Sequence, residues 1–251
     1  MADNLGVTTT PAAVLAHELQ RDGARPFLTW YDDATGERVE LSVATTANWA
    51  AKIGNYLADE LGVGPGDDVA VLLPMHWQTA VVLLGVWNVG AAAHTDVNAT
   101  SSAAVTSADR REEARRQLAD FEVLTLGLEP MGVGLSQLVA AQPDDFAGPP
   151  ARPDLPALVV GDRRWSHGEL AAAAAHGAAH HGLDAESRVL STLPFDTVDG
   201  LDTGLLLPLA AGGSVVLVAS ADESLLAERC RSERVTHTAG VTVAGVPRLD
   251  R

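Results

Sequence analysis

The chain has 251 residues, 47% of them hydrophobic, which is enough apolar material for a sizeable core in one large unit or two packed lobes. Its 33 acidic residues outnumber the 17 basic ones, and the net charge of −16 excludes a broad basic surface for nucleic acid. The single cysteine, Cys230, excludes an intrachain disulfide and a multi-cysteine metal site, and it favours a reducing compartment.

Neither targeting nor membrane insertion is indicated by the sequence. Residues Met1 to Thr10 lack a basic region followed by an apolar run. The apolar run Val69–Leu73 is interrupted by Pro74, well short of the length of a membrane span. We therefore expect a cytoplasmic protein that does not contact a membrane.

In the first half, apolar runs with β-branched residues alternate with Ala/Leu-rich segments of helical period, which is typical of an α/β protein with a mostly parallel sheet. A stop at Gly62 and a turn at Gly64–Asp67 connect the first helix to the first strand, and Thr95 to Ala108 is predicted to be a loose stretch. The expected elements are helix Thr46–Leu61, strand Val69–Leu73, helix Trp77–Val89, helix Asp109–Phe121, strand Val123–Leu126, loop Gly127–Gly134 and helix Leu135–Ala141.

A proline-rich segment, residues 143–156, follows these elements and is interpreted as a linker between a first α/β lobe, 1–142, and a second lobe, 157–251. In the second lobe, Ser166 and Glu169 have capping-box spacing, so we expect Ser166 to begin a helix. The expected elements are strand Ala157–Val160, helix Ser166–His181, strand Arg188–Leu193, helix Asp199–Ala211, strand Ser214–Val218, helix Glu223–Arg231 and strand Val235–Thr238.

The order and spacing of residues in Asn48–Ala93 follow a specific pattern, "A..L...GV.PGD.VAV.LP…GA". On these residues the chain resembles the adenylate-forming superfamily of acyl-CoA synthetases, peptide synthetase adenylation domains and luciferases. The resemblance implies an α/β fold with two lobes of mostly parallel sheet flanked by helices, like the first part of that family's large N-terminal domain. Further matching segments are Trp165-Ser166-His167-Gly168-Glu169-Leu170, Val189-Leu190-Ser191-Thr192-Leu193-Pro194-Phe195-Asp196, Leu207–Leu217, Val235-Thr236-His237 and Gly245-Val246-Pro247.

One departure from the family pattern lies between Leu158 and Ser166. The family has a Ser/Thr/Gly-rich phosphate loop with a lysine there, whereas this chain has only Val159–Trp165. Adenylation needs amides, hydroxyls and cations around the phosphates of ATP. The family's adenine and ribose motifs and its C-terminal lysine would follow Pro247, but the sequence ends at Arg251. We therefore predict a degenerate relative with no catalytic residue, resembling a family member that is truncated.

Three pairs of residues are the candidates for ligand binding. Arg163 and Arg164 are either a substitute for the phosphate loop or solvated turn residues. Phe195 and Asp196 match a turn that lies beside the acid-substrate cavity in the family; alternatively, Phe195 is core and Asp196 caps the next segment. Glycine permits close approach of the backbone to a ligand, which makes Gly212 and Gly213 the third pair.

No metal site is predicted. His176 and His180 have a spacing that can ligate a metal, but surface histidines near a helix end are the simpler interpretation.

The sequence leaves three hypotheses for function. The first is a non-catalytic, AMP-binding-like binding or interaction module. The others are an acid-activating ligase that needs a partner chain, and an α/β protein that binds a nucleotide or acyl compound. Only these two would use ATP, AMP or CoA, and no cofactor is predicted otherwise. In longer enzymes later elements cover the surface where this chain stops, so we expect a homodimer or a protein partner there.

Overall fold

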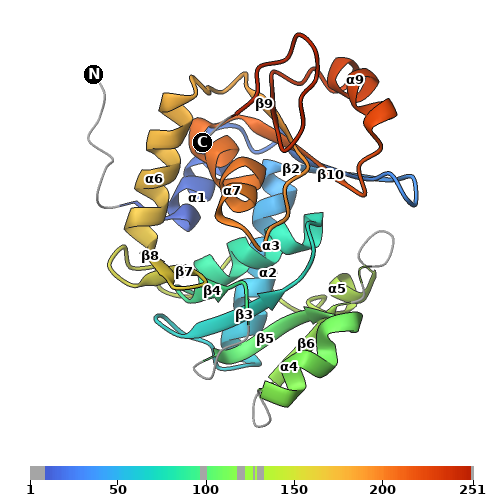
Figure 1. The fold of residues 1–251 in the computed structure, drawn as a ribbon. Coiled ribbons are helices and arrows are strands. Elements are labelled where there is room, and N and C mark those ends of the chain that lie inside the picture. The colour runs from blue at the N-terminus through green and yellow to red at the C-terminus, as the bar shows by residue number, and fades with distance from the viewer. Residues whose placement is uncertain (1–8, 97–100, 118–121, 127, 129–132, 250–251) are drawn as a thin grey trace.

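The computed structural model describes residues 9–96, 101–117, 122–126, 128 and 133–249, and places them in two β-sheets with helices between and around them (Figure 1). Most of the expected loop Gly127–Gly134 lies outside the described residues.

One sheet has six strands in the order β6-β5-β3-β4-β7-β8, and all neighbours are parallel except the antiparallel hairpin β7-β8. Its strands are β3 (Asp68–Leu72), β4 (Ala92–His94), β5 (Ser101–Ser107), β6 (Glu122–Leu126), β7 (Pro156–Val160) and β8 (Arg163–Ser166).

The other sheet has five strands in the order β11-β9-β10-β1-β2, with β1-β2 as its antiparallel pair. Its strands are β1 (Pro26–Asp32), β2 (Glu37–Ser42), β9 (Arg188–Ser191), β10 (Ser214–Ala219) and β11 (His237–Ala239). Residues 247–249 lie along the outer side of β11, where the Thr238 N–H donates to the Pro247 carbonyl and the Leu249 N–H donates to the Thr238 carbonyl, both at 2.8 Å.

The helices pack between and around the two sheets (Figure 1). Helix α3 contacts β3 and β4 of one sheet and β1 of the other, so its sequence is apolar on every side. The helical elements are α1 (Pro11–Asp22), α2 (Val43–Asp59), α3 (Trp77–Asn88), a 3₁₀ turn (Ala108–Arg110), α4 (Arg111–Gln117), α5 (Val133–Leu138), α6 (His167–His180), α7 (Val198–Leu201), a π-helical turn (Asp202–Leu206), α8 (Leu207–Ala211) and α9 (Glu223–Ser232).

The mixed α/β class with two mostly parallel sheets is the fold class predicted from the sequence. Sheet membership, however, crosses the proline-rich segment 143–156. Strands β1 and β2 come from the first 142 residues yet join β9–β11, whereas β7 and β8 follow the segment and join β3–β6. The two sheets therefore do not coincide with the expected lobes 1–142 and 157–251.

The expected loose stretch Thr95–Ala108 was wrong over residues 101–107, which form β5 inside the sheet. The sequence of this strand is rich in serine and alanine, and Ser101 and Ala103–Ser107 are nevertheless buried in it. Helix α1 and strands β1, β2, β4 and β8 were not anticipated.

The capping box at Ser166 is confirmed. The Ser166 Oγ accepts from the Glu169 N–H at 3.2 Å, and the Glu169 carboxylate accepts from the Ser166 N–H at 2.9 Å. Gly62 has φ +67°, the left-handed conformation expected where the first helix stops. Within the described ranges, no helix is both long and apolar enough to cross a bilayer.

Candidate functional site

A cavity of about 330 Å³ opens at the carboxyl ends of β3, β5 and β9, between the two sheets. We call it the strand-end cavity. The carboxyl ends of parallel strands are where α/β proteins commonly bind ligands. Its lining residues are Val71, Leu73, Pro74, Met75, Thr95, Ser107, Asp109, Arg110, Leu128, Pro194, Phe195 and Asp196.

Phe195 and Asp196 are the sequence candidates that line this cavity. The Phe195 side chain is buried, and its ring packs where Gly204 leaves room, since a Cβ there would lie 2.5 Å from Phe195 Cε1. Asp196 is exposed at the cavity mouth. The Thr197 hydroxyl donates to the Pro194 carbonyl at 2.9 Å, which holds the turn that carries both side chains.

Among the described residues that line the strand-end cavity, the cationic one is Arg110. Its guanidinium donates to both carboxylate oxygens of Glu113 at 2.9 Å. That hydrogen bond, opposed by burial and assisted by Glu113, Asp109 and Asp196, raises the pKa of Arg110 above its usual value. A ligand headgroup would therefore meet a guanidinium already shared among carboxylates, with the hydroxyls of Thr95 and Ser107 as further hydrogen-bonding groups.

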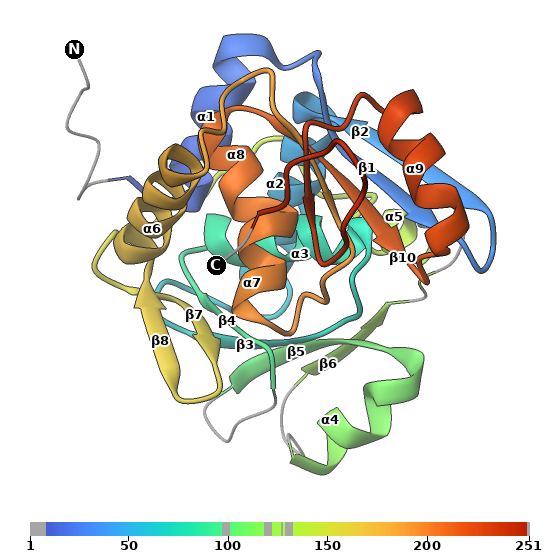
Figure 2. The ribbon, with the colours of Figure 1, turned by 45° about the horizontal axis from the view of Figure 1, so that its top comes forward.

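Arg163 and Arg164 lie elsewhere, on the outermost strand of the six-stranded sheet (Figure 2). The Arg163 guanidinium stacks on the ring of Trp165, 4.5 Å from its centroid. Arg164 Nη2 lies 4.0 Å from a carboxylate oxygen of Asp68, whose other oxygen is 2.9 Å from His94 Nε2. Neither arginine lines the strand-end cavity.

The hairpin that carries these arginines has a two-residue turn, Gly161-Asp162, between Val160 and Arg163. Gly161 has φ +57°, as tight hairpin turns require. The position where the resemblance calls for a phosphate loop is thus occupied by one of the shortest connections that a hairpin can have. A two-residue turn offers fewer backbone N–H groups than a longer Gly-rich loop from which to build an anion-binding nest.

Gly212 and Gly213 serve contacts within the protein. The Gly212 carbonyl accepts from Arg21 Nη2 at 2.9 Å, and the Gly213 carbonyl accepts from Arg25 Nη1 at 2.6 Å. A Cβ at Gly212 would lie 2.6 Å from Arg21 Nη2, so the close approach expected at this glycine is made by α1. Both glycines are absent from the lining of the strand-end cavity.

The two histidines with metal-ligand spacing, His176 and His180, are exposed on α6. Among the residues that the structure describes, no group of three or more His, Cys, Asp or Glu side chains could hold a metal ion.

Sequence reasoning missed Thr95 and Arg110. Thr95 follows β4 and Arg110 follows β5, and neither strand was predicted from the sequence. The two residues could therefore not be recognised as lying at strand ends, where ligand-binding residues are expected. Had β5 been recognised, Arg110 three residues beyond its end would have been a natural candidate.

Comparisons with known proteins decide the family. A model of the family described as AMP-binding enzyme matches residues 15–124. A TIGR03089 family protein of Mycobacterium tuberculosis is 43% identical over 239 residues, which is 91% of this chain and 97% of that protein. The chain belongs to the TIGR03089 family. The chain is also 29% identical over 237 residues to the sulfoacetate–CoA ligase of Cupriavidus necator, which covers 84% of this chain and 45% of the ligase.

Solved structures confirm the fold. The N-terminal domain of FACL13 from Mycobacterium tuberculosis superposes with a TM-score of 0.77 at 17% identity, over 92% of this chain and 62% of that structure. The anthranilate CoA ligase AuaEII in complex with anthranoyl-AMP also gives 0.77 at 17% identity, over 96% and 51%. The chain therefore spans about half to two thirds of these structures and has the two-sheet architecture of adenylate-forming N-terminal domains.

Proposed function

We propose that this protein is a non-catalytic member of the adenylate-forming fold that acts as a binding or interaction module. The observation that carries the proposal is the two-residue turn Gly161-Asp162 at the place of the phosphate loop. An adenylating enzyme must hold the phosphates of ATP while a carboxylate displaces pyrophosphate, and the charge that develops needs preorganised donors.

The basic side chains of the hairpin do not replace those donors. Arg163 and Arg164 are exposed, and each already has a neighbour, the Trp165 ring and the Asp68 carboxylate. An exposed guanidinium can pair with a phosphate oxygen, but it lacks the fixed geometry of backbone amides in a loop.

ATP–pyrophosphate exchange with a panel of carboxylic acids tests the proposal. We expect the purified chain to give no exchange above the rate without protein. The sulfoacetate–CoA ligase of Cupriavidus necator, assayed with sulfoacetate, serves as the active control. Exchange by the chain alone at a comparable rate would overturn the proposal in favour of an active ligase, and exchange only after a second protein is added would favour a ligase completed by a partner.

The strand-end cavity favours a second candidate function, which is binding of a nucleotide or acyl compound without turnover. Its position at the strand ends and the guanidinium of Arg110 support this candidate. Thermal unfolding with ATP, AMP, CoA and acyl compounds tests it, because a ligand at 100 times its Kd adds about 2.7 kcal/mol to stability. We expect Phe195→Ala to abolish any ligand-induced rise in Tm and the exposed turn variant Asp162→Asn to leave it unchanged.

Self-association or a protein partner belongs to the same proposal, since a module without catalysis acts through what it binds. We propose that the partner uses the end of the five-stranded sheet near β11 and α9, where the exposed Leu225 lies on α9. Multi-angle light scattering of the purified chain checks self-association, and a strictly monomeric protein would count against it. The buried Cys230, whose thiol pKa is raised by burial, is compatible with the cytoplasmic setting that we infer.

A further inference from the structure

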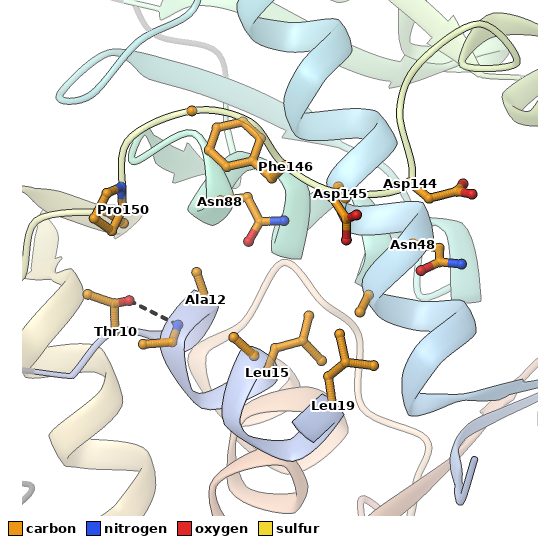
Figure 3. A pocket seen from close by; sticks show the side chains of 16 residues that line it. Thr10, Ala12, Leu15, Leu19, Asn48, Asn88, Asp144, Asp145, Phe146 and Pro150 are labelled. Carbon is orange, nitrogen blue, oxygen red and sulfur yellow. Dashed lines mark hydrogen bonds between the residues drawn. The ribbon is translucent and has the colours of Figure 1, made fainter. Parts of the chain in front are cut away.

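A second cavity lies away from the strand ends, between α1, α2, the end of α3 and residues 144–151 (Figure 3). We call it the helical hollow. Its volume is about 680 Å³, twice that of the strand-end cavity. The lining residues are Thr10, Ala12, Ala13, Leu15, Ala16, Leu19, Ala47, Asn48, Ala51, Asn88, Asp144, Asp145, Phe146, Gly148, Pro150 and Ala151.

The wall formed by the proline-rich segment is fixed to α2. The Asn55 amide donates to the carbonyls of Pro143 and Asp145 at 3.2 and 2.9 Å, and its oxygen accepts from the Ala147 N–H at 3.3 Å. Lys52 Nζ donates to the Gln142 carbonyl at 2.5 Å and lies 3.0 Å from the Asp144 carboxylate. Because buried Asn55 alone ties three points of this segment, the hollow is preformed and needs no closure to exist.

Small residues keep the hollow open. Phe146 packs against Gly54 of α2, where a Cβ would lie 3.0 Å from Phe146 Cδ2, so its ring is seated on the helix. On the opposite side, α1 contributes Ala12, Ala13 and Ala16, whose methyl groups do not fill the space. The interior surface is therefore mainly apolar, with alanine, leucine and phenylalanine carbons exposed to it.

Polar groups gather along one rim. In Figure 3 the Asn88 amide and the Asp145 carboxylate both point from that rim toward α1, and Asn48 lies on α2 beside them. Asp144 is neutralised by Lys52. The Asp145 carboxylate makes no ion pair or hydrogen bond with the part of the chain that is described, and no Lys, Arg or His is among the described lining residues.

The groups at the rim favour a positively charged ligand over a negatively charged one. An anion entering the hollow would meet Asp145 without a lining cation, in a protein whose net charge is −16. A cation would gain an opposite charge, and the Asn88 and Asn48 amide oxygens can accept hydrogen bonds from it. The volume falls within the range of sites that hold compact organic molecules, about 300–1,000 Å³.

We propose that the helical hollow is a binding site for a small apolar molecule that carries a protonated amine. The apolar body packs against α1 and Phe146, and the ammonium group lies at the Asn88–Asp145 rim. This site shares no lining residue with the strand-end cavity, so it stands or falls independently of the proposed function.

A set of compounds with one body and three headgroups tests the proposal. Phenethylamine, phenethyl alcohol and phenylacetate are titrated into ¹⁵N-labelled protein while the side-chain amide signals of Asn48 and Asn88 are followed. We expect phenethylamine to bind at least threefold more tightly than the alcohol, phenylacetate to bind most weakly, and the Asn48 and Asn88 signals to shift. The preference should fall as salt is raised, because the rim is exposed.

Two variants with matched controls locate the effect. Ala16→Leu places a larger side chain in the hollow and should abolish binding of the amine, whereas Ala175→Leu on the exposed face of α6 should not. Asp145→Asn should weaken the amine about threefold and leave the alcohol unchanged, as an exposed ion pair is worth little; Asp162→Asn is its control. Circular dichroism checks that each variant is folded.

Three results would overturn the proposal: no shift at Asn48 or Asn88 with any of the compounds, phenylacetate binding as tightly as phenethylamine, or undiminished binding by folded Ala16→Leu protein. Binding of a basic amphipathic peptide without binding of the amine would also overturn it, since the hollow would then be a protein-docking groove.

Discussion

The β3–α3 unit and the β7–β8 hairpin both contribute strands to the six-stranded sheet but differ greatly in exposure. Every residue of β3 is buried, and α3 is buried along nearly its whole length between the sheets. In the hairpin, Arg163 and Arg164 are exposed and the turn faces solvent. A change is costly where side chains pack on all sides, whereas a solvent-facing turn tolerates changes without unfolding of the protein.

The largest expected effect follows from breaking the β3–α3 unit at Gly85. A Cβ on Gly85 would lie 2.5 Å from Ile53 Cγ2 and 3.1 Å from the Ala50 carbonyl, both in α2. We expect Gly85→Val to lower the free energy of unfolding by about 3 kcal/mol, because neither helix can move away in a packed core. Urea unfolding measures it. Gly64→Ala, whose Cβ would make only an ordinary contact at 3.7 Å, is the control and should cost far less.

A smaller effect is expected from His76, the N-cap of α3, whose Nδ1 accepts from the Gln78 N–H at 3.1 Å. Burial, only partly opposed by the charge of Asp32, lowers the pKa of His76 to about 4 from 6.5. As the pH is lowered below 6.5, the unfolded chain binds a proton at His76, whereas the folded chain binds it only near pH 4. The free energy of unfolding therefore falls as the pH is lowered from 6.5 to about 4.

Unfolding in urea at pH 7 and pH 5 measures the His76 contribution. We expect His76 to account for about 2 kcal/mol of the loss between these pH values. His76→Asn keeps a capping side chain but does not titrate, so its loss should be smaller by that amount. If the wild-type protein and His76→Asn lost the same free energy of unfolding between pH 7 and pH 5, the His76 ring would be protonated in the folded state as readily as in the unfolded chain.

At the base of the hairpin, Ser166→Ala tests the residue that ends β8 and caps α6. Removing the hydroxyl leaves the Glu169 N–H without its partner, and we expect a loss of about 1 kcal/mol. Ser166→Asp retains a capping oxygen and should restore most of it. If Ser166→Ala left stability unchanged but removed ligand binding, Ser166 would be a binding residue.

The smallest effect is expected in the hairpin itself. Arg163→Ala removes the exposed stacking on Trp165, which is worth about 0.5 kcal/mol at such a site. Thermal unfolding should shift by only a few degrees at most. A loss comparable to that of Gly85→Val would contradict the view that the hairpin is tolerant of change.

Periodicity was a good guide where elements repeat locally. It predicted α2, α3 and α6 within a few residues, because each has an apolar stripe, a buried core or a capping signal at its start. It failed at β5, whose Ser- and Ala-rich sequence lacks β-branched enrichment and which becomes a strand only through its neighbours. The pairing of β1 with β10 could not be foreseen either, since it joins residues almost 190 positions apart.

The candidate site was predicted only in part. Phe195 and Asp196 were placed at a strand end by the resemblance, and the cavity lies there. Arg163, Arg164, Gly212 and Gly213 were chosen for residue type, which says nothing about the neighbours that the fold brings to them, such as Arg21 beside Gly212. The helical hollow left no sequence signal because alanines on separate helices look like ordinary helix formers.

The contact between residues 247–249 and β11 governs access to one margin of the five-stranded sheet. Both main-chain groups of Thr238 on that side are engaged, with Pro247 and Leu249. Another chain could pair with the main chain of Thr238 only after displacing residues 247–249. A partner that leaves these residues in place must bind this edge of the sheet through side chains. Residues 247–249 therefore also hinder edge-to-edge pairing of β11 with another copy of the chain, which an exposed edge strand would allow.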